Sequence, residues 1–235
     1  MKGYLFSNQI SLIGRRTIIG YGTPTFFVME IPRKKSNEII IKNHYSKKVA
    51  GFGCTSYIFL GVFIDGRLVG TLQFGYAMNQ KSCENIVKNT SVNEYLELNR
   101  MWFDDIAPKN SESKALSYSI KYIRGKFPRI QWIQSFADER CGCFGIVYQS
   151  ANFKYYGEHL NEFYDLDGET IHKMRLTRKE DSRYNELNER KNEMKKNVYR
   201  QFRYIYFIYQ NKIKDCLFTE QPYPKHYKET ANPTA

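Results

Sequence analysis

The chain has 235 residues, 42% of them hydrophobic and 16% aromatic, with a formal net charge of +12. This length and apolar content suffice for one substantial core. No apolar run reaches about 18 residues, which excludes a membrane-spanning helix. The positive charge favours a polyanionic partner, nucleic acid before an anionic membrane surface. The alternative is a soluble protein from a lysine- and asparagine-rich proteome.

The five cysteines indicate a reducing compartment. Their number is odd and no signal segment opens the chain, so we expect a cytoplasmic protein with free thiols. Cys141 and Cys143 are separated by a single residue, which is too short for the usual spacing of zinc ligands. Structural cysteines are therefore expected in place of a zinc cluster.

The first part of the chain predicts strands separated by polar loops. Residues 26–31 form a short strand that Pro32 ends, and residues 33–35 are a basic loop. An apolar run at 39–41 comes next. Residues 43–48 then place an imidazole, a phenol, a hydroxyl and two ammonium groups side by side.

The middle of the chain alternates strands and helices. Two β-prone runs, 57–64 and 68–74, flank Asp65-Gly66 and predict a hairpin. The elements that follow are a strand at 95–101, a helix beginning near Ser111 with Ala115, Leu116, Ile120 and Ile123 on one face, a strand at 130–136 and a short helix at 145–151.

The last third begins with a second predicted hairpin, around Asp167-Gly168 within 161–176. Residues 179–197 are polar nearly throughout, which predicts a solvated helix or a mobile insertion without a core role. Residues 200–209 read as the final strand, buried on both faces. Prolines make the tail, from about 219 to 235, extended and exposed.

This order of elements predicts an α/β fold in which a mixed, largely antiparallel central sheet is flanked by helices. One such domain is expected to cover residues 1–235. No GxGxxG or GxxxxGK(S/T) motif is present, so neither dinucleotide binding nor a Walker-type nucleotide site is indicated.

Polar residues gather at the ends of two predicted strands. Arg100 follows the apolar run of the first, and Asp138 follows that of the second. Neighbouring strand ends in an open α/β sheet form the crevice where ligands bind, so these two are the first candidates. Glu97, Asn99 and Ser135 lie beside them as candidates for binding substrate or donor.

The sequence resembles the Mom-type DNA adenine-modification proteins of phage Mu at NHYSKK, ELNRMWFDD, PKNSESKA, SFADERCGCFGIVYQSANFKYYG and the closing PYPK. The similarity runs from about Ile41 to Gly157, plus the tail, with its segments in the same order. It implies a fold like that of the GNAT acyltransferases. It also implies conversion of adenine in DNA to a carbamoylmethyl derivative at N6, which shields phage DNA from restriction. The functional positions that it implies are His44, Tyr45, Arg100, Asp138 and Tyr148.

Modification of adenine N6 requires an enzyme that holds the base out of the duplex, orients N6 and removes a proton. Asp138 is the candidate base or acceptor for N6; the alternatives are a helix N-cap or an ion pair with Arg100. Arg100 is expected to hold a carboxylate or phosphate, unless it forms that same ion pair. Tyr45 and Tyr148 are expected to stack on the base or donate a proton, unless they only pack.

His44 has two interpretations. It is either a general base with a pKa near neutrality or a metal ligand, and the resemblance raises iron as the metal. A non-haem iron site needs a second histidine, and His159 and His172 are distant in the sequence.

The donor site departs from the acyltransferase pattern. Those enzymes have a Q/R-x-x-G-x-G/A loop before the helix, whereas this chain reads APKNSESKA, without glycine. The donor is therefore left open between an acyl-CoA-type carrier and another carrier. Ser111 and Ser113 can supply N–H or hydroxyl donors at the helix start, and Ser46 is a further binding candidate.

Double-stranded DNA is the expected partner, without a membrane, and a homodimer is left open. The candidate phosphate contacts are Arg33, Lys34, Lys35, Lys47, Lys48, Lys154 and Arg203. Two other functions are weighed against DNA modification: an N-acyltransferase acting on a small molecule or protein, and a nucleic-acid-binding protein without catalysis. The missing glycine loop disfavours the first, and the polar clusters NHYS, ELNR and SFAD disfavour the second.

Overall fold

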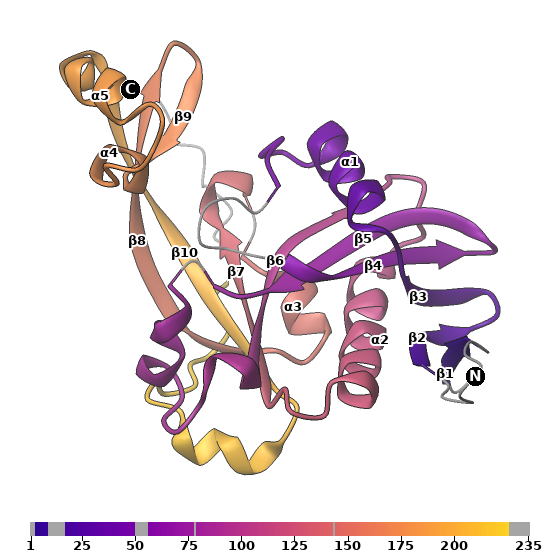
Figure 1. Cartoon of the computed structure of the whole chain (residues 1–235). Helices are drawn as coiled ribbons and strands as arrows, with labels where there is room; N and C mark the ends of the chain where they lie inside the picture. Colours follow the sequence, from indigo (N-terminus) through magenta and orange to yellow (C-terminus); the bar gives the residue numbers. More distant parts are fainter. Residues whose placement is uncertain (1–2, 9–16, 50–55, 78, 143, 226–235) are drawn as a thin grey trace, which may run out of the picture.

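The computed structural model describes residues 3–8, 17–49, 56–77, 79–142 and 144–225. One ten-stranded sheet organises them, with the strand order β1-β2-β3-β4-β5-β6-β7-β10-β8-β9. The strands are β1 (Tyr4–Asn8), β2 (Thr17–Thr23), β3 (Phe26–Glu30), β4 (Ser56–Ile64), β5 (Arg67–Gly75), β6 (Tyr95–Phe103), β7 (Trp132–Asp138), β8 (Lys154–Leu166), β9 (Glu169–His172) and β10 (Lys195–Phe207). The helices are α1 (Arg33–Asn43), α2 (Ser111–Lys126), α3 (Ile146–Ser150), α4 (Met174–Thr177) and α5 (Tyr184–Glu189) (Figure 1).

The sheet is mixed and largely antiparallel, as predicted. Among the described strands, only β6 and β7 are paired in parallel, and α2 makes the crossover between them. Both predicted hairpins are confirmed. Their turns, Asp65-Gly66 and Asp167-Gly168, have positive φ at both residues, the backbone that two-residue hairpin loops require.

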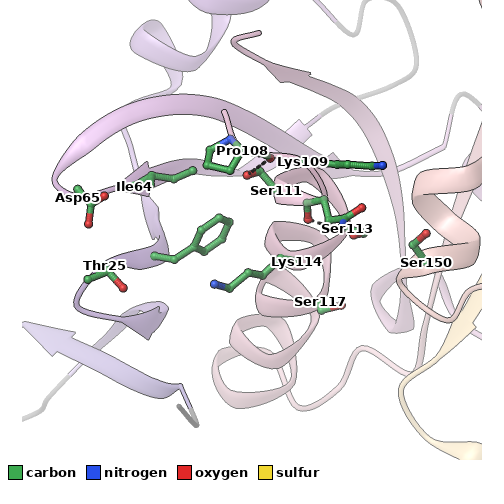
Figure 2. A pocket seen from close by; sticks show the side chains of 12 residues that line it. Thr25, Ile64, Asp65, Pro108, Lys109, Ser111, Ser113, Lys114, Ser117 and Ser150 are labelled. Atoms are coloured by element: carbon green, nitrogen blue, oxygen red, sulfur yellow. Dashed lines mark hydrogen bonds between the residues drawn. The ribbon is translucent and has the colours of Figure 1, made fainter. Parts of the chain in front are cut away.

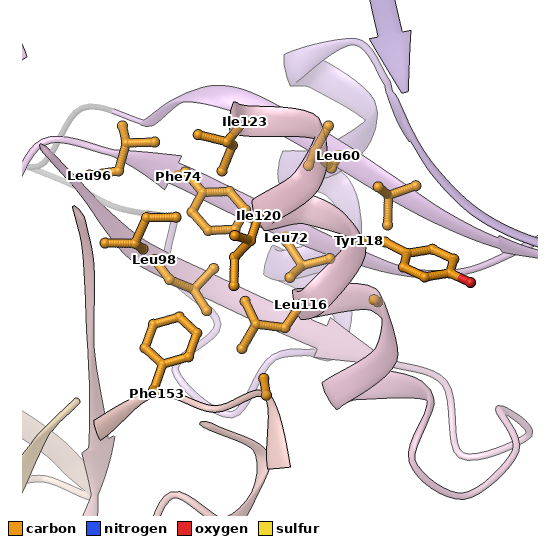
Figure 3. Close-up of a cluster of buried hydrophobic side chains, with 14 of the residues drawn as sticks. Leu60, Leu72, Phe74, Leu96, Leu98, Leu116, Tyr118, Ile120, Ile123 and Phe153 are labelled. Atoms are coloured by element: carbon orange, nitrogen blue, oxygen red, sulfur yellow. The ribbon is translucent and has the colours of Figure 1, made fainter. Parts of the chain in front are cut away.

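Helix α2 covers one face of the sheet. The predicted apolar face of the helix is confirmed, since Ala115, Leu116, Ile120 and Ile123 are each at most 5% exposed. They pack against alternate residues of the central strands, including Leu72 of β5 (Figure 3). Deep burial of these side chains against the sheet makes this layer the main source of hydrophobic stabilisation. The helix begins at Ser111, as predicted, and Asn110 occupies its N-cap position.

Helix α1 covers the opposite face, and the sequence interpretation missed it. Its triplet of isoleucines at 39–41 favours a strand by β-propensity. The helix forms because its buried Ser36 lies within hydrogen-bond distance of Thr71, 2.8 Å between the hydroxyls, and accepts a bond from Gln73 Nε2 at 2.9 Å. Both partners alternate with Leu72 on β5, which places α1 across the sheet from α2. The expected basic loop at 33–35 is the first turn of this helix.

The polar segment 179–197 is not devoid of a core, contrary to prediction. It contains α5 and the first residues of β10, and its Leu187 is fully buried. Leu187 joins Leu166, Ile171 and Leu176 in a small hydrophobic cluster separate from the main core. We call residues 160–199 the arm; it projects beyond the sheet at the upper left of Figure 1. The predicted final strand is confirmed, although it begins at Lys195.

The start of the tail packs on β8. Gln221 N–H donates to the Tyr155 carbonyl at 2.9 Å, and the Tyr223 hydroxyl donates to the Phe153 carbonyl at 2.8 Å. These bonds hold 221–223 against the sheet edge, although their side chains are exposed as expected. No helix in the described ranges is long and apolar enough to cross a membrane.

Candidate functional site

The candidate site lies where β6 and β7 part. The two strands pair over three residues each, ending at Glu97 and Gln134. Beyond that point β6 continues to Phe103 and β7 to Asp138 without pairing to each other. Backbone groups on the facing edges are thus not used by a β6–β7 ladder, and the side chains there flank a break in the sheet.

The end of α1 delivers His44 and Tyr45 to this place. The helix ends at Asn43, and the His44 N–H closes its last turn by donating to the Ile40 carbonyl at 3.0 Å. His44 is 7% exposed, whereas Tyr45 is 60% exposed, and their ring centroids are 4.2 Å apart. The pair therefore presents one buried imidazole and one accessible aromatic ring.

The tautomer of His44 follows from its neighbours. The backbone N–H of Ser46 lies 3.1 Å from His44 Nδ1, and an N–H can only donate, so Nδ1 is the acceptor. The proton of the neutral ring is then on Nε2. Burial, and to a smaller extent the charge of Arg100, lowers the pKa of His44 to about 4. The pKa of His44 thus lies below the near-neutral value that the sequence interpretation assumed, and the neutral ring carries its proton on Nε2.

Arg100 is anchored by backbone carbonyls. Its Nε donates to the Lys48 carbonyl at 2.9 Å and its Nη1 to the Asn99 carbonyl at 2.6 Å. Its Nη2 has no hydrogen-bond partner within the described ranges. Arg100 is thus held in place with donor capacity left over for a ligand.

Asp138 forms a different ion pair from the one predicted. Its carboxylate pairs with Arg140, whose Nε lies 3.0 Å from both carboxylate oxygens. The Arg140 backbone N–H also donates to Oδ1 at 3.0 Å, so Asp138 caps the short 3₁₀ turn Glu139–Cys141. The N-cap alternative is therefore confirmed. The predicted ion pair with Arg100 is wrong, because Arg140, only two residues further along the chain, is the cation that contacts the carboxylate.

Four of the five positions implied by the resemblance interact electrostatically. Arg100 acts on the pKa of His44. Burial raises the pKa of Tyr45, and the charges of Cys141, Asp138, Arg140 and Arg100 act on it as well. The Tyr45 phenol is thus protonated at neutral pH, between the β6 and β7 sides of the break.

Tyr148, the fifth, lies on the α2 side of the sheet. It is partly buried against the main core, with its ring 5.3 Å from that of Tyr204. Its hydroxyl donates to the Phe136 carbonyl at 3.5 Å, on the part of β7 that has left β6. Gly145 makes this packing possible, because a Cβ at that position would lie 2.3 Å from the Tyr204 ring.

The candidates beside Arg100 and Asp138 are buried and incompletely satisfied. Gln134 Nε2 donates to Glu97 at 2.8 Å. Burial raises the pKa of Glu97 to about 7, although the hydrogen bond from Gln134 and the charges of Arg100 and Arg203 act to lower it. Asn99 Oδ1 and Ser135 Oγ are buried without a hydrogen-bond partner. Glu97 and Asp138 lie on neighbouring strands about four residues apart, or about 13 Å along the strands, so the two carboxyl groups are at different places along the break.

The helix-start serines line a cavity of about 430 Å³ at the beginning of α2 (Figure 2). Ser111 Oγ donates to the Pro108 carbonyl at 2.6 Å and Ser113 Oγ to the Asn110 carbonyl at 3.2 Å, so both hydroxyls have backbone acceptors. Lys109 and Lys114 add positive charge to the lining. The cavity extends to Ser150 of α3, on the same side of the sheet as Tyr148.

The predicted phosphate contacts are scattered over the molecule. Arg33, Lys34 and Lys35 are exposed on α1. The other four each have a partner. Lys47 donates to the Lys42 carbonyl, and Lys48 pairs with Glu169. Lys154 pairs with Glu220, and Arg203 is partly buried between the Phe136 and Phe218 rings.

Sequence reasoning missed Arg140 and gave His172 no role beside Asp138. Arg140 neutralises Asp138, and its guanidinium lies 3.8 Å from the centroid of the Phe163 ring in the arm. His172, from β9, is close enough for Asp138 and Arg140 to act on its pKa, which burial lowers. The motif SFADER, with an arginine two residues after the aspartate, was the available signal for Arg140.

The donor set does not fit iron. No group of three or more histidine, cysteine, aspartate or glutamate side chains that could hold a metal occurs in the part of the chain that the structure describes. His44 has Nδ1 engaged by Ser46, and both oxygens of Asp138 are engaged by Arg140. In His44, the residue named as a possible iron ligand, the Nδ1 lone pair is therefore occupied by the Ser46 N–H.

Comparisons with known proteins complete this picture. Residues 25–225 match the model of the Mom protein family. The methylcarbamoylase Mom of Escherichia phage Mu is 43% identical over 213 residues, which cover 88% of this chain and 87% of that protein.

Solved acetyltransferases show a much weaker likeness. The ribosomal-protein-S5-alanine acetyltransferase of Vibrio fischeri aligns with 80% of this chain and 96% of its own, at 8% identity and a TM-score of 0.47. A putative acetyltransferase of Salmonella typhimurium, solved with acetyl-CoA, aligns with 79% and 95% at 8% identity and a TM-score of 0.46. Neither bears on the substrate of this chain. By sequence, the chain belongs to the Mom protein family.

Proposed function

We propose that the protein transfers a carbamoylmethyl or related acyl-type group to N6 of adenine in DNA, and so protects phage or mobile-element DNA from restriction. The observation that carries this proposal is the convergence of His44, Tyr45, Arg100 and Asp138 at the break between β6 and β7, in a chain of the Mom family. The phage Mu relative, named a methylcarbamoylase, supports the type of group transferred.

The polar groups match the edge of an extruded adenine. Adenine presents an N–H donor at N6 and an acceptor at N1. Asp138, whose carboxylate is held by Arg140, accepts a hydrogen bond from N6–H, and His44 Nε2–H donates to a ring nitrogen. The exposed ring of Tyr45 offers a stacking surface for the base, in the way that flipped bases are held.

The donor approaches from the other side of the sheet. An acyl-CoA-type carrier fits the cavity at the start of α2, where backbone N–H groups, Lys109 and Lys114 favour phosphate. Arg100 Nη2 holds an oxygen of the group in transfer. The new bond forms at N6 as the bond to the carrier breaks, and one proton leaves N6. Glu97, with a pKa raised to about 7, is suited to hold a proton near the break.

The test is nucleoside analysis of DNA from cells that express the protein. The parent should yield a deoxyadenosine heavier than the unmodified one, and the DNA should resist adenine-sensitive restriction enzymes. Asp138→Asn and Arg100→Ala should each reduce the modified nucleoside by about 100-fold or more. Asp105→Asn is the matched control, because Asp105 is exposed on the loop that follows β6.

Unmodified deoxyadenosine from cells with verified soluble parent protein would contradict the proposal and favour an acyltransferase with another acceptor. Thermal melting of Asp138→Asn separates chemistry from folding. A variant that melts like the parent but leaves adenine unmodified assigns the loss to the reaction.

A further inference from the structure

The outward side of α1 carries an unusual combination of charge and exposed apolar surface. We call its exposed side chains Lys34, Lys35, Glu38, Ile41 and Lys42 the α1 face. They point away from the buried side of the helix, which Ser36 and Ile40 form against the sheet. Three cations and one acid thus surround Ile41, which is 52% exposed.

The cations of the α1 face outnumber its single acid, Glu38. Lys34, Lys35 and Lys42 form no ion pair with any residue in the described ranges. Elsewhere, even the neighbouring Lys48 has a carboxylate partner, Glu169, at 2.9 Å. Like charges on one short helix repel each other, and a polyanion relieves that repulsion.

The first turn of α1 is also unfavourable for the helix itself. It contains Arg33, Lys34 and Lys35 and no acidic residue, and Pro32 provides no side-chain cap. The helix N-terminus carries partial positive charge and is stabilised by anions, so three cations there reduce the stability of the isolated protein. The arrangement makes physical sense for a surface that meets negative charge.

The position of the face excludes the carrier as its ligand. The cavity at the start of α2 lies across the sheet from α1, as Figure 1 shows for the two helices. In contrast, α1 leads directly into His44 and Tyr45. With 11 residues, α1 is about 16 Å long, which corresponds to about five base-pair steps of about 3.4 Å.

We propose that double-stranded DNA docks on the α1 face, with Lys34, Lys35 and Lys42 on backbone phosphates and Ile41 against the duplex beside the extruded adenine. This inference rests on the proposed function and names the surface that its substrate uses. Apolar side chains set among phosphate-binding cations are the usual means of supporting an unstacked base step. Lys48, Lys154 and Arg203 are not part of this surface, because ion pairs or aromatic rings engage them.

The test is a triple variant, Lys34→Gln, Lys35→Gln and Lys42→Gln. The matched control, Lys81→Gln, Lys88→Gln and Lys214→Gln, removes the same charge from exposed residues in or near two 3₁₀ segments, η1 (Gln80–Asn85) and η5 (Gln210–Asp215), at the far end of the molecule from α1. Fluorescence anisotropy with a 30-base-pair duplex is measured between 50 and 200 mM salt. Thermal melting of both variants confirms folding, and cellular DNA is analysed for modified deoxyadenosine.

The α1 variant should bind the duplex about 10- to 100-fold more weakly than the parent, and the slope of log K against log salt should fall by about 2.7, from three lost phosphate contacts. Modified deoxyadenosine should fall with it, while the control stays within about threefold in affinity. Equal losses in the two variants, or none in the α1 variant, would overturn the docking surface and leave the proposed function standing. If the parent protein neither binds the duplex nor modifies adenine, both the docking surface and the proposed function are contradicted.

Discussion

The arm and the α1 region are both rich in lysine and arginine, yet their charges are arranged in opposite ways. Residues 160–199 contain nine basic and nine acidic side chains, whereas residues 33–48 contain six basic side chains and one acidic one. In the arm, Arg175, Arg183 and Arg190 each contact at least one carboxylate within 2.8 Å. In α1, the three lysines of the outward side form no ion pair with any residue that the structure describes.

The difference shows that net charge alone does not locate a polyanion site. Cations with carboxylate partners help to hold a segment together, and the neighbouring negative charge weakens their attraction for an external anion such as phosphate. Cations without partners are available to phosphates. The two regions meet at Lys48 and Glu169, and Lys48 also supplies the carbonyl that anchors Arg100. The arm thus contacts the site through this ion pair on the β6 side and through the Arg140–Phe163 contact on the β7 side.

The largest effect is expected from the small core of the arm. Leu187→Ala should destabilise the arm by about 2–5 kcal/mol, because a fully buried side chain is replaced by a cavity. Hydrogen exchange of the amides between 160 and 199 measures this directly. Leu160→Ala, at a residue that is 67% exposed, should change the free energy of opening measured by exchange by less than about 0.5 kcal/mol. Unchanged exchange in Leu187→Ala would mean that ion pairs alone hold the arm.

The pKa values of two carboxyl groups, one in the arm and one at the site, shift in opposite directions. In the arm, hydrogen bonds from Lys196 and Lys173 lower the pKa of Glu162 to about 2, while burial raises that of Glu97 to about 7. A raised pKa means that the folded state holds a proton that the unfolded state loses above about 4.5. This stabilisation is present at low pH and is lost as pH rises through 7.

Glu97→Gln removes that dependence. From pH 4.5 to 8, the stability of the variant relative to the parent should rise by up to about 3 kcal/mol. Chemical denaturation at both pH values measures the difference, with Glu84→Gln as an exposed control. A constant difference across this range would show that Glu97 ionises normally in the folded protein.

A smaller effect is expected when the arm is made to resemble α1. Glu169→Gln removes the carboxylate shared by Lys48, Arg175 and Arg183. These pairs are partly exposed, so the free energy of unfolding should fall by only about 1 kcal/mol. Binding to the duplex should strengthen, because cations lose their partner. Glu180→Gln makes the same charge change at an exposed arm residue, and an equal gain there would mean that net charge, not pairing, decides.

The smallest effect is the converse change on α1. Glu38 is the only acid of the helix and lies one turn from both Lys34 and Lys42. Glu38→Gln should strengthen duplex binding about two- to threefold by removing repulsion from phosphate. Glu84→Gln, far from α1, should change it less. Weaker binding by Glu38→Gln would place the duplex elsewhere on the surface.

Local signals in the sequence were sufficient for much of the fold. Asp65-Gly66 and Asp167-Gly168 dictate their hairpins through backbone geometry, and the face formed by Leu116, Ile120 and Ile123 dictates α2. Helix α1 escaped notice because what stabilises it is a contact of Ser36 with Thr71, 35 residues away. Leu187 was missed for the same reason, since its partners come from β8, β9 and α4.

The sequence by itself determined the family and the sheet class, because these depend on motifs and on local periodicity, and it nominated the candidate residues of the site. The tertiary structure alone decided how those residues are paired. Asp138 is bound by Arg140 and Arg100 by two carbonyls, and the imidazole of His44 is neutral because of its burial and its neighbour Ser46. Ionisation and pairing depend on dielectric surroundings and on distances of a few ångströms between remote segments, and these distances exist only once the chain has folded.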